Sequence, residues 1–211
     1  MSSTQQGTVR KLLEAHGTTF AADADITLRD EPACLWQLLV LAQLLSTRIS
    51  SDIAVATARE LWKAEWRTPA NLRRSTWQQR VNALGRGGYR RYDESTATRL
   101  EANVVLLDER WNGDLRELRD EADGDAAGIE ELLQTFDGIG PTGADIFLRE
   151  VQDVWPSVAP YADKLVVRGA KAAGLPTTPD ELFALCPSVR AAHLAAALVR
   201  VARKPSILER L

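Results

Sequence analysis

Helical periodicity of the apolar residues is the feature that most constrains the fold of this chain. Apolar positions recur about every three or four residues along most of the sequence, and no alternating strand pattern of any length accompanies them. The segment Ala33 to Ser46 is apolar on nearly all sides, which predicts a helix buried all round. The sequence therefore predicts an all-α protein, with helices over residues 9–15, 33–46, 52–65, 76–84, 94–111, 129–136, 143–151, 163–173, 179–185 and 189–203.

Size and composition are those of an ordinary folded domain. The chain has 211 residues, of which 45% are hydrophobic and 26% charged, enough to bury a sizeable core. It contains no run of about 18 apolar residues, which excludes a membrane-spanning helix, and the first ten residues lack the apolar segment of a secretion signal. We therefore expect a cytoplasmic protein.

The cysteine and histidine content restricts metal chemistry. Cys34 and Cys186 are far apart and each lies in an apolar helical context, so we expect free thiols rather than a disulfide or metal ligands. The chain has only these two cysteines and two histidines, His16 and His193. It therefore cannot supply the four thiolates that hold an iron–sulfur cluster. An iron–sulfur cluster held by this chain alone is thus excluded, and we expect no metal centre.

Charge is distributed unevenly although the net value is only −3. Residues 67–99 hold eight arginines against Asp93 and Glu94, whereas residues 101–137 hold twelve acids against three arginines. Such a chain can be acidic overall and still present one basic face to a nucleic acid. The alternative is two solvated helix faces of opposite sign, and composition alone does not decide between them.

The stretch F-D-G-I-G-P-T-G-A, Phe136 to Ala144, concentrates conformational freedom between two predicted helices. Gly138 and Gly140 can adopt positive φ and allow close approach to their N–H groups, and Pro141 fits the first turn of a helix. A tight hairpin with free amides at a helix N-terminus is a favourable anion site, for which a backbone phosphate is the natural candidate. The alternative is that these residues form only a glycine helix cap followed by a turn, with no bound ligand.

The sequence around this stretch resembles a known motif. L-L-Q-T-F-D-G-I-G-P-T-G-A-D-I-F-L-R-E-V is similar to the helix–hairpin–helix of the endonuclease III superfamily of DNA glycosylases. That family places an aspartate about 25 residues after the first glycine, and here Asp163 follows Gly138 at that distance in Y-A-D-K-L-V-V-R. Arg168 stands five residues after the aspartate, as in the family.

The resemblance extends upstream, so that it covers roughly residues 35–174. L-L-V-L-A-Q-L-L-S-T-R-I-S-S-D resembles the buried family helix that is followed by the residue filling the void in the DNA, which falls on Arg48. G-R-G-G-Y-R-R-Y resembles the second DNA-wedging loop. The family fold would make residues 1–211 a single helix–hairpin–helix unit with two helical lobes and an active-site cleft between them. The expected lobes are residues 33–135 and residues 1–32 plus 136–211.

One departure from the family bears on the chemistry. Bifunctional members carry a lysine four residues after the first glycine of the hairpin, and here that position is Thr142. A threonine cannot form an imine, so β-lyase chemistry should be absent. Lys164 is not expected to substitute, because its place inside a helix aims it elsewhere. Asp163 is then the expected catalytic carboxylate, which stabilises an oxocarbenium-like sugar or activates a water, although such an aspartate can also be a helix N-cap.

The resemblance also implies how DNA would be bound. Amides of the hairpin hold a phosphate, with a monovalent cation as the one expected accessory and no cofactor required. Arginines neutralise further phosphates, Arg48 fills the space of the rotated nucleotide, and Tyr89 or Tyr92 wedges into the opposite strand. Two tryptophans are candidates to stack on the flipped base, with core packing as the alternative. The expected DNA-binding residues are Gly138, Ile139, Gly140, Arg48, Arg86, Tyr89, Arg90 and Arg91, and the base-pocket candidates are Trp36 and Trp155.

Three functions are compatible with these residues. The first is a monofunctional DNA glycosylase of base excision repair, a nucleoid-associated monomer acting on double-stranded DNA that contains a damaged or mismatched base. The second is a binder of abasic sites or distorted DNA that has little or no turnover. The third is a helical scaffold unrelated to DNA. The sequence does not indicate which base would be removed.

Overall fold

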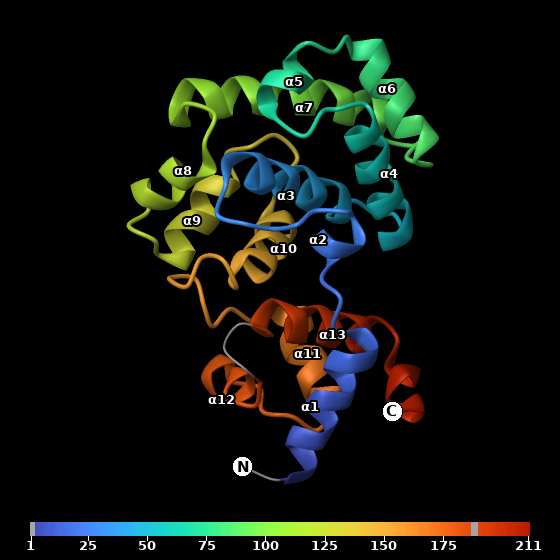
Figure 1. Ribbon diagram of the computed structural model, residues 1–211, viewed down its shortest axis with the longest axis vertical. Helices are drawn as coiled ribbons and strands as arrows, with labels where there is room; N and C mark the ends of the chain where they lie inside the picture. Colours follow the sequence, from blue (N-terminus) through green and yellow to red (C-terminus); the bar gives the residue numbers. More distant parts are fainter. Residues whose placement is uncertain (1–2, 187–189) are drawn as a thin grey trace. The chain divides into compact units, whose positions relative to one another are not determined.

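The computed structural model describes residues 3–186 and 190–211, and within these ranges it contains helices and no strand (Figure 1). This confirms the all-α prediction. The beginning of the last long helix expected at Val189 lies outside the described residues. The helices are α1 Ser3–His16, α2 Phe20–Asp23, α3 Pro32–Leu45, α4 Ser51–Lys63, α5 Pro69–Arg73, α6 Trp77–Arg86, α7 Asp93–Trp111, α8 Leu115–Glu121, α9 Ala126–Leu133, α10 Pro141–Val151, α11 Lys164–Ala172, α12 Pro179–Phe183 and α13 Ala191–Arg203, followed by the 3₁₀ helix η2 Pro205–Arg210.

The chain divides into two compact units. Unit 1 comprises Met1–Phe20 and Leu148–Leu211, and unit 2 comprises Ala21–Phe147. These bounds differ from the expected division at residues 32/33 and 135/136. The indole of Trp62 donates to the carbonyl of Ala24 (2.9 Å), which ties the segment before α3 to unit 2. Buried side chains of α3 and α7 bind the glycine hairpin to the same unit.

Unit 2 is built around α3, whose residues Leu35 to Leu44 are all buried. Helices α4 and α8 pack on α3, and α6 packs on both α4 and α7. Local signals start these helices where the sequence predicts: the Ser50 hydroxyl accepts from the N–H of Ile53 (3.3 Å) at α4, and Thr76 with Gln79 forms a reciprocal capping box at α6. The core of unit 2 thus holds the helix that the sequence predicts to be buried.

Unit 1 is held by α13, against which α1 and α11 pack. At the α11–α13 crossing a Cβ on Gly169 would lie 2.0 Å from the carbonyl oxygen of Leu198, so only glycine permits this approach. The Nδ1 of His193 and the carbonyl oxygen of Gly17 are 2.7 Å apart, and Arg200 donates to the carbonyl of His16 (3.1 Å). The N-terminal helix is therefore fixed to the C-terminal part of the chain.

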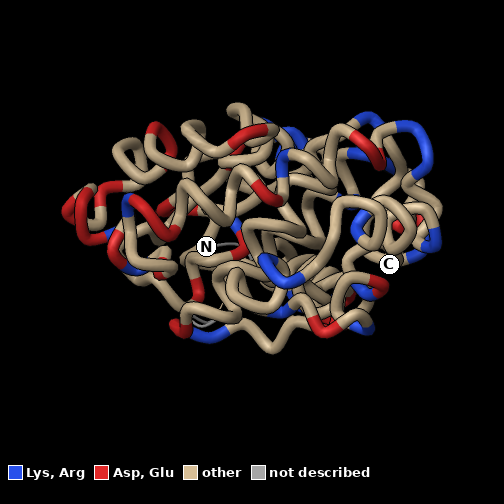
Figure 2. The backbone as a smooth tube through the Cα atoms, turned by 90° about the horizontal axis from the view of Figure 1, so that it is seen from above, with Lys and Arg blue, Asp and Glu red and all other residues tan. Residues whose placement is uncertain are grey.

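The charge asymmetry of the sequence is also an asymmetry in space within unit 2. Figure 2 shows acidic positions gathered over α8 and α9 and basic positions over the opposite end, at α6 and the loop after it.

Cys34 and Cys186 are free thiols, as expected, and both are half-buried.

Candidate functional site

The glycine stretch forms a tight hairpin between α9 and α10. Phe136 and Ile139 anchor it, because their side chains are only 1% and 4% exposed. The N–H of Ile139 donates to the carbonyl of Phe136 (3.0 Å), and between them Gly138 has a φ of +82°, a region that disfavours side chains with a Cβ. The hairpin geometry expected from the sequence is present.

Two buried amide side chains hold the hairpin backbone in place. The carbonyl of Asp137 accepts from Nε2 of Gln43 on α3 and from Nδ2 of Asn103 on α7, each at 3.0 Å. The N–H of Asp137 donates back to Oδ1 of Asn103 (2.7 Å). Both amides are almost fully buried, at 3% and 2% exposure. The hairpin is thus preorganised by unit 2 before any ligand arrives.

The hairpin leaves two exposed backbone donors at the start of α10. Gly140 and Thr142 are exposed, and within residues 3–186 and 190–211 neither backbone N–H has an acceptor, while Pro141 between them has no N–H. The N–H of Ile139 already donates to Phe136 inside the turn, and its contact with a phosphate stays a prediction. An anion would meet the amides of Gly140 and Thr142.

Arg99 of α7 lies directly against the hairpin, which the sequence did not indicate. A Cβ built on Gly138 would be 3.0 Å from Cδ of Arg99 and 3.5 Å from its Nη1. The arginine is exposed, and in the part of the chain that the structure describes it has no ion pair. Arg99 is far from the hairpin in sequence, and no sequence pattern indicates that the two would be in contact. The guanidinium adds a positive charge beside the open amides.

The segment with Arg48 adjoins the same hairpin. A Cβ on Gly143 would meet Cβ of Ser46 at 3.6 Å, so the residues that follow α3 pack on the first turn of α10. Arg48 itself is exposed. The structure therefore brings together the hairpin and the arginine expected to enter the DNA.

Tyr89, a candidate DNA wedge, is buried in this structure. Its ring is 1% exposed, and its hydroxyl lies 2.5 Å from Oγ1 of Thr47. Burial raises the pKa of Tyr89, against the smaller lowering effects of its hydrogen bonds and of the charge of Arg99. The wedge role of Tyr89 stays a prediction, and in this structure its hydroxyl links its loop to Thr47, next to Arg48. Tyr92 remains half-buried.

The arginines of the loop differ in their availability. Arg90 and Arg91 are exposed, with the guanidinium of Arg91 5.4 Å from the ring of Tyr92. Arg86 is also exposed, but its Nε donates to Glu60 (3.0 Å). Hydrogen bonds from Lys63 and Arg86 lower the pKa of Glu60, which keeps this acceptor ionised. Part of the charge of Arg86 is therefore already compensated.

The two tryptophans proposed for a base pocket belong to the core. Trp36 of α3 is 0% exposed and Trp155 is 1% exposed. Neither ring offers a face to a base in this structure. The alternative of core packing, left open by the sequence, describes both.

Asp163 is the N-cap of α11 and belongs to unit 1. Its Oδ1 accepts from the N–H groups of Leu165 (2.9 Å) and Val166 (2.8 Å). Its Oδ2 forms an ion pair with Nη1 of Arg149, and the two side chains are 3% and 2% exposed. The carboxylate is thus buried and paired with a guanidinium. Lys164, the next residue, is exposed.

Arginines surround this carboxylate. Arg168 donates to the carbonyl of Ala202 (3.1 Å), and the pKa of Arg203 is lowered by burial and then by the charges of Arg149 and Arg168. The Nε of Arg149 is buried without a hydrogen-bond partner in the described residues. Asp163 thus acts electrostatically on Arg203 as well as on Arg149. In the described ranges no three His, Cys, Asp or Glu side chains gather as a metal site.

Comparison with known proteins identifies the fold. No protein-family model matches this chain, and no curated protein matches it either. A solved non-covalent complex of endonuclease III with DNA matches with a TM-score of 0.52 and 17% identity, over 97% of this chain and 87% of that one. A trapped covalent endonuclease III–DNA intermediate matches with a TM-score of 0.49 and 17% identity, over 95% and 86%. The chain has an endonuclease III-like fold, and none of its described helices is long and apolar enough to cross a membrane.

Proposed function

We propose that this chain binds duplex DNA containing a damaged or mismatched base and hydrolyses the N-glycosidic bond of that base. The observation that carries the proposal is the preorganised hairpin, with the amides of Gly140 and Thr142 open beside Arg99, in a fold shared with a protein solved in complex with DNA. Such a hairpin is suited to a backbone phosphate. The arginines around it would make the affinity fall with salt.

The chemistry would rest on Asp163. As the C1′–N bond breaks, its electron pair leaves with the base and positive charge develops on the sugar. A carboxylate stabilises that charge. Water bonds through its oxygen to C1′, where one proton stays in the new hydroxyl, and its other proton ends on the departing base. Thr142 at the position of the family lysine cannot form an imine, so strand cleavage should not follow. The activity would be that of a monofunctional glycosylase, acting as a monomer without a cofactor, with a monovalent cation at the hairpin as an optional component.

The ion pair between Arg149 and Asp163 favours a second candidate. A carboxylate that already compensates a buried guanidinium and caps α11 has a complete structural role without any reaction. The chain would then recognise abasic or distorted DNA through the hairpin and release no base. Both candidates share the same DNA-binding surface in unit 2.

Base release from a panel of labelled duplexes separates the two candidates. The panel would contain alkylated purine, uracil or thymine opposite guanine, oxidised pyrimidine, and adenine opposite oxidised guanine, each read with and without alkali. Breaks that require alkali and disappear in Asp163→Asn would support the glycosylase and identify its base. Absence of breaks on every duplex, with retained binding to an abasic site, would support the second candidate. Breaks without alkali would contradict the argument from Thr142.

A further inference from the structure

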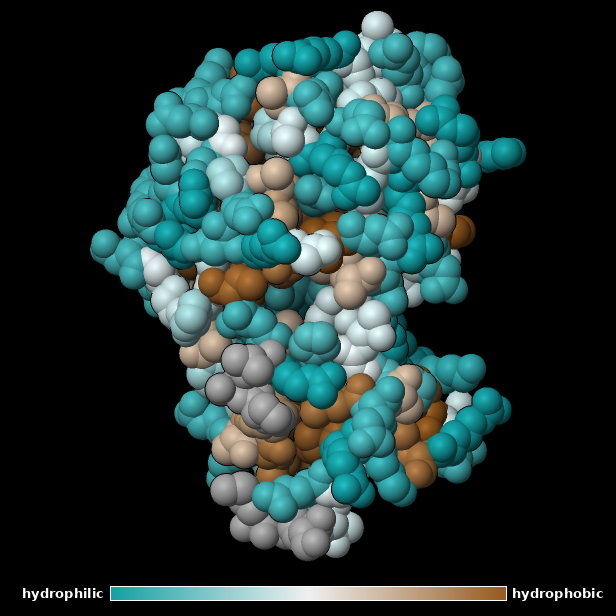
Figure 3. All heavy atoms as spheres, viewed as in Figure 1, coloured by the Kyte–Doolittle hydropathy of each residue, from teal (hydrophilic) through white to brown (hydrophobic). Residues whose placement is uncertain are grey.

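A polar groove lies along α6, within unit 2. It consists of two adjoining hollows, of about 410 Å³ and about 570 Å³, which share Asn82 and Arg86. The surface over α5, α6 and α7 is mostly hydrophilic in the view of Figure 3. The first hollow is lined by Ala64, Trp66, Arg74, Ser75, Gln79, Asn82 and Arg86, and the second by Val81, Asn82, Gly85, Arg86, Arg90 and Asp93.

Three guanidinium groups follow one another along this groove: Arg74, Arg86 and Arg90. Of the three, only Arg86 has an ion pair within the described residues, with Glu60 (3.0 Å), and Lys63 shares that carboxylate (2.6 Å). Asp93 contributes one further negative charge to the lining. The groove therefore keeps an excess of positive charge after its internal partners are counted.

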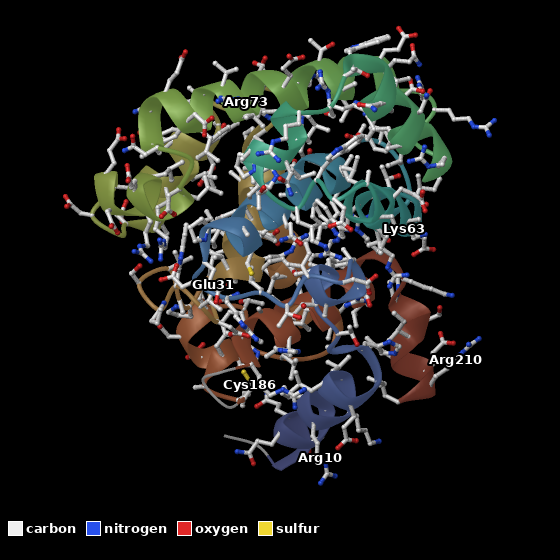
Figure 4. The ribbon with its side chains drawn as sticks, turned by 45° about the horizontal axis from the view of Figure 1, so that its top comes forward. Arg10, Glu31, Lys63, Arg73, Cys186 and Arg210 are labelled. Atoms are coloured by element: carbon white, nitrogen blue, oxygen red, sulfur yellow. The ribbon has the colours of Figure 1, made fainter. Side chains whose placement is uncertain are left out.

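Neighbouring arginines show that this excess is not a general property of the segment. Arg73, next to Arg74, turns to α7 and forms an ion pair with Asp108 (Figure 4). Arg80 is 1% exposed and forms an ion pair with Glu101. Its guanidinium also donates to the carbonyls of Ala97 and Ser75, both at 3.0 Å. Arginines that face α7 thus serve packing, whereas Arg74 and Arg90 face the groove and serve no internal partner in the described residues.

The groove continues the proposed DNA surface. Arg90 lies in the loop that Tyr89 fixes to Thr47, and Thr47 precedes Arg48 in the chain. A path of exposed positive charge therefore leads from the Arg48 segment through Arg90 and Arg86 to Arg74, all within unit 2. Guanidinium groups and amide side chains spaced along an open groove suit a chain of phosphodiesters, with its repeated anionic oxygens.

We propose that this groove binds the phosphodiester backbone of the DNA that flanks the target base, with Arg74 as its outermost contact. The inference rests on the proposed function, because it extends the same DNA-binding surface. It assigns no part in base release to the groove. Its consequence is a longer binding site than the hairpin and the Arg48 segment would give alone.

Arg74 and Arg73 provide a matched pair of variants for the test. Affinity for an abasic-site duplex would be measured over a range of salt concentrations for wild type, Arg74→Gln and Arg73→Gln, on a short duplex and on one longer by several helical turns. On the long duplex, Arg74→Gln should weaken binding several-fold and reduce the slope of log K against log salt by about 1. On the short duplex its effect should vanish, and Arg73→Gln should keep the wild-type slope on both.

Three results would overturn the inference: no effect of Arg74→Gln, an equal effect on both duplexes, or the same loss of slope in Arg73→Gln. Unfolding in urea would be recorded for both variants, and Arg74→Lys should restore the slope if charge is what matters. The outcome is independent of catalysis. A chain that binds DNA but releases no base can still pass this test, and an active glycosylase can still fail it.

Discussion

Arg149 and Asp163 form an ion pair that is almost completely removed from solvent, with Nη1 of the arginine against Oδ2 of the carboxylate. The other carboxylate oxygen caps α11 through two backbone N–H groups. The residue expected to act in catalysis therefore also holds together α10 and α11. Any change to it alters folding as well as chemistry, and the two effects must be measured separately.

Asp163→Asn should lower the free energy of unfolding by about 3–5 kcal/mol, because the guanidinium of Arg149 would stay buried without a counter-charge. Asparagine keeps an oxygen for the cap, so the loss comes mainly from the ion pair. Denaturant unfolding measures it. Arg149→Gln provides the control, since it breaks the same pair but keeps the carboxylate. If the proposed hydrolysis occurs, folded Arg149→Gln should still release base and Asp163→Asn should not; equal loss of base release would leave Asp163 with a structural role only.

Local features of this protein could be predicted from its sequence. Gly138 takes positive φ, Asp163 caps its helix, and α3 is buried, because each depends on residues within a few positions of one another. Contacts between distant segments could not be predicted. Gln43 is 94 residues from Asp137, and no periodicity indicates that its amide would reach the hairpin carbonyl.

The same reason explains which features of the site the sequence did not indicate. Tyr89 belongs to an arginine-rich loop, but its ring is buried and its hydroxyl meets Thr47, 42 residues away in sequence. The contact of Arg99 with the hairpin could not be predicted, because Arg99 lies inside a regular helix and a single exposed arginine there has no distinguishing sequence pattern. The contacts of a surface arginine depend on the tertiary structure, so they cannot be predicted from the number of charged residues in a sequence segment.

Gly138→Ala should destabilise unit 2 by about 1–3 kcal/mol, because φ is +82° and the new Cβ would lie 2.8 Å from Nε2 of Gln43. Gly140→Ala is the matched control, since a Cβ there would have no neighbour within 4 Å. Its unfolding free energy should change by less than about 1 kcal/mol. Thermal unfolding of both variants tests the relationship, and comparable losses at the two glycines would show that the hairpin is not held as described.

Arg99→Met should weaken binding of abasic-site DNA and reduce the salt slope by about 1, whereas Arg99→Lys should keep most of the slope. Methionine keeps an apolar stem against Gly138, so folding should be little affected. Arg110 lies on the same helix but pairs with Glu121, so Arg110→Met serves as the control. Wild-type salt dependence in Arg99→Met would mean that the guanidinium only packs on the hairpin.

The thiol of Cys186 should react slowly with iodoacetamide at pH 8, because burial and the nearby charge of Asp153 raise its pKa to about 11. The folded state thus holds this proton more tightly than the unfolded state does. The stability contributed by the protonated thiol is present below the pKa of the unfolded thiol, about 8.5, and is lost as the pH rises toward 11. Stability of wild type should therefore fall more steeply than that of Cys186→Ser over this interval. Alkylation as fast as that of an unfolded peptide would contradict the burial.

Thr142→Lys should convert alkali-dependent breaks into spontaneous strand cleavage, if the hairpin is placed on DNA as in the resemblance. Thr142 is exposed in the first turn of α10, so a lysine can be accommodated there without entering the core. An amine at this position can attack C1′ and form an imine that borohydride reduces to a stable protein–DNA adduct. Wild type should give no adduct, and Thr142→Arg, with a similar charge but no nucleophilic amine, should give none. An adduct from wild type would point to another amine, with Lys164 as the first to replace by methionine.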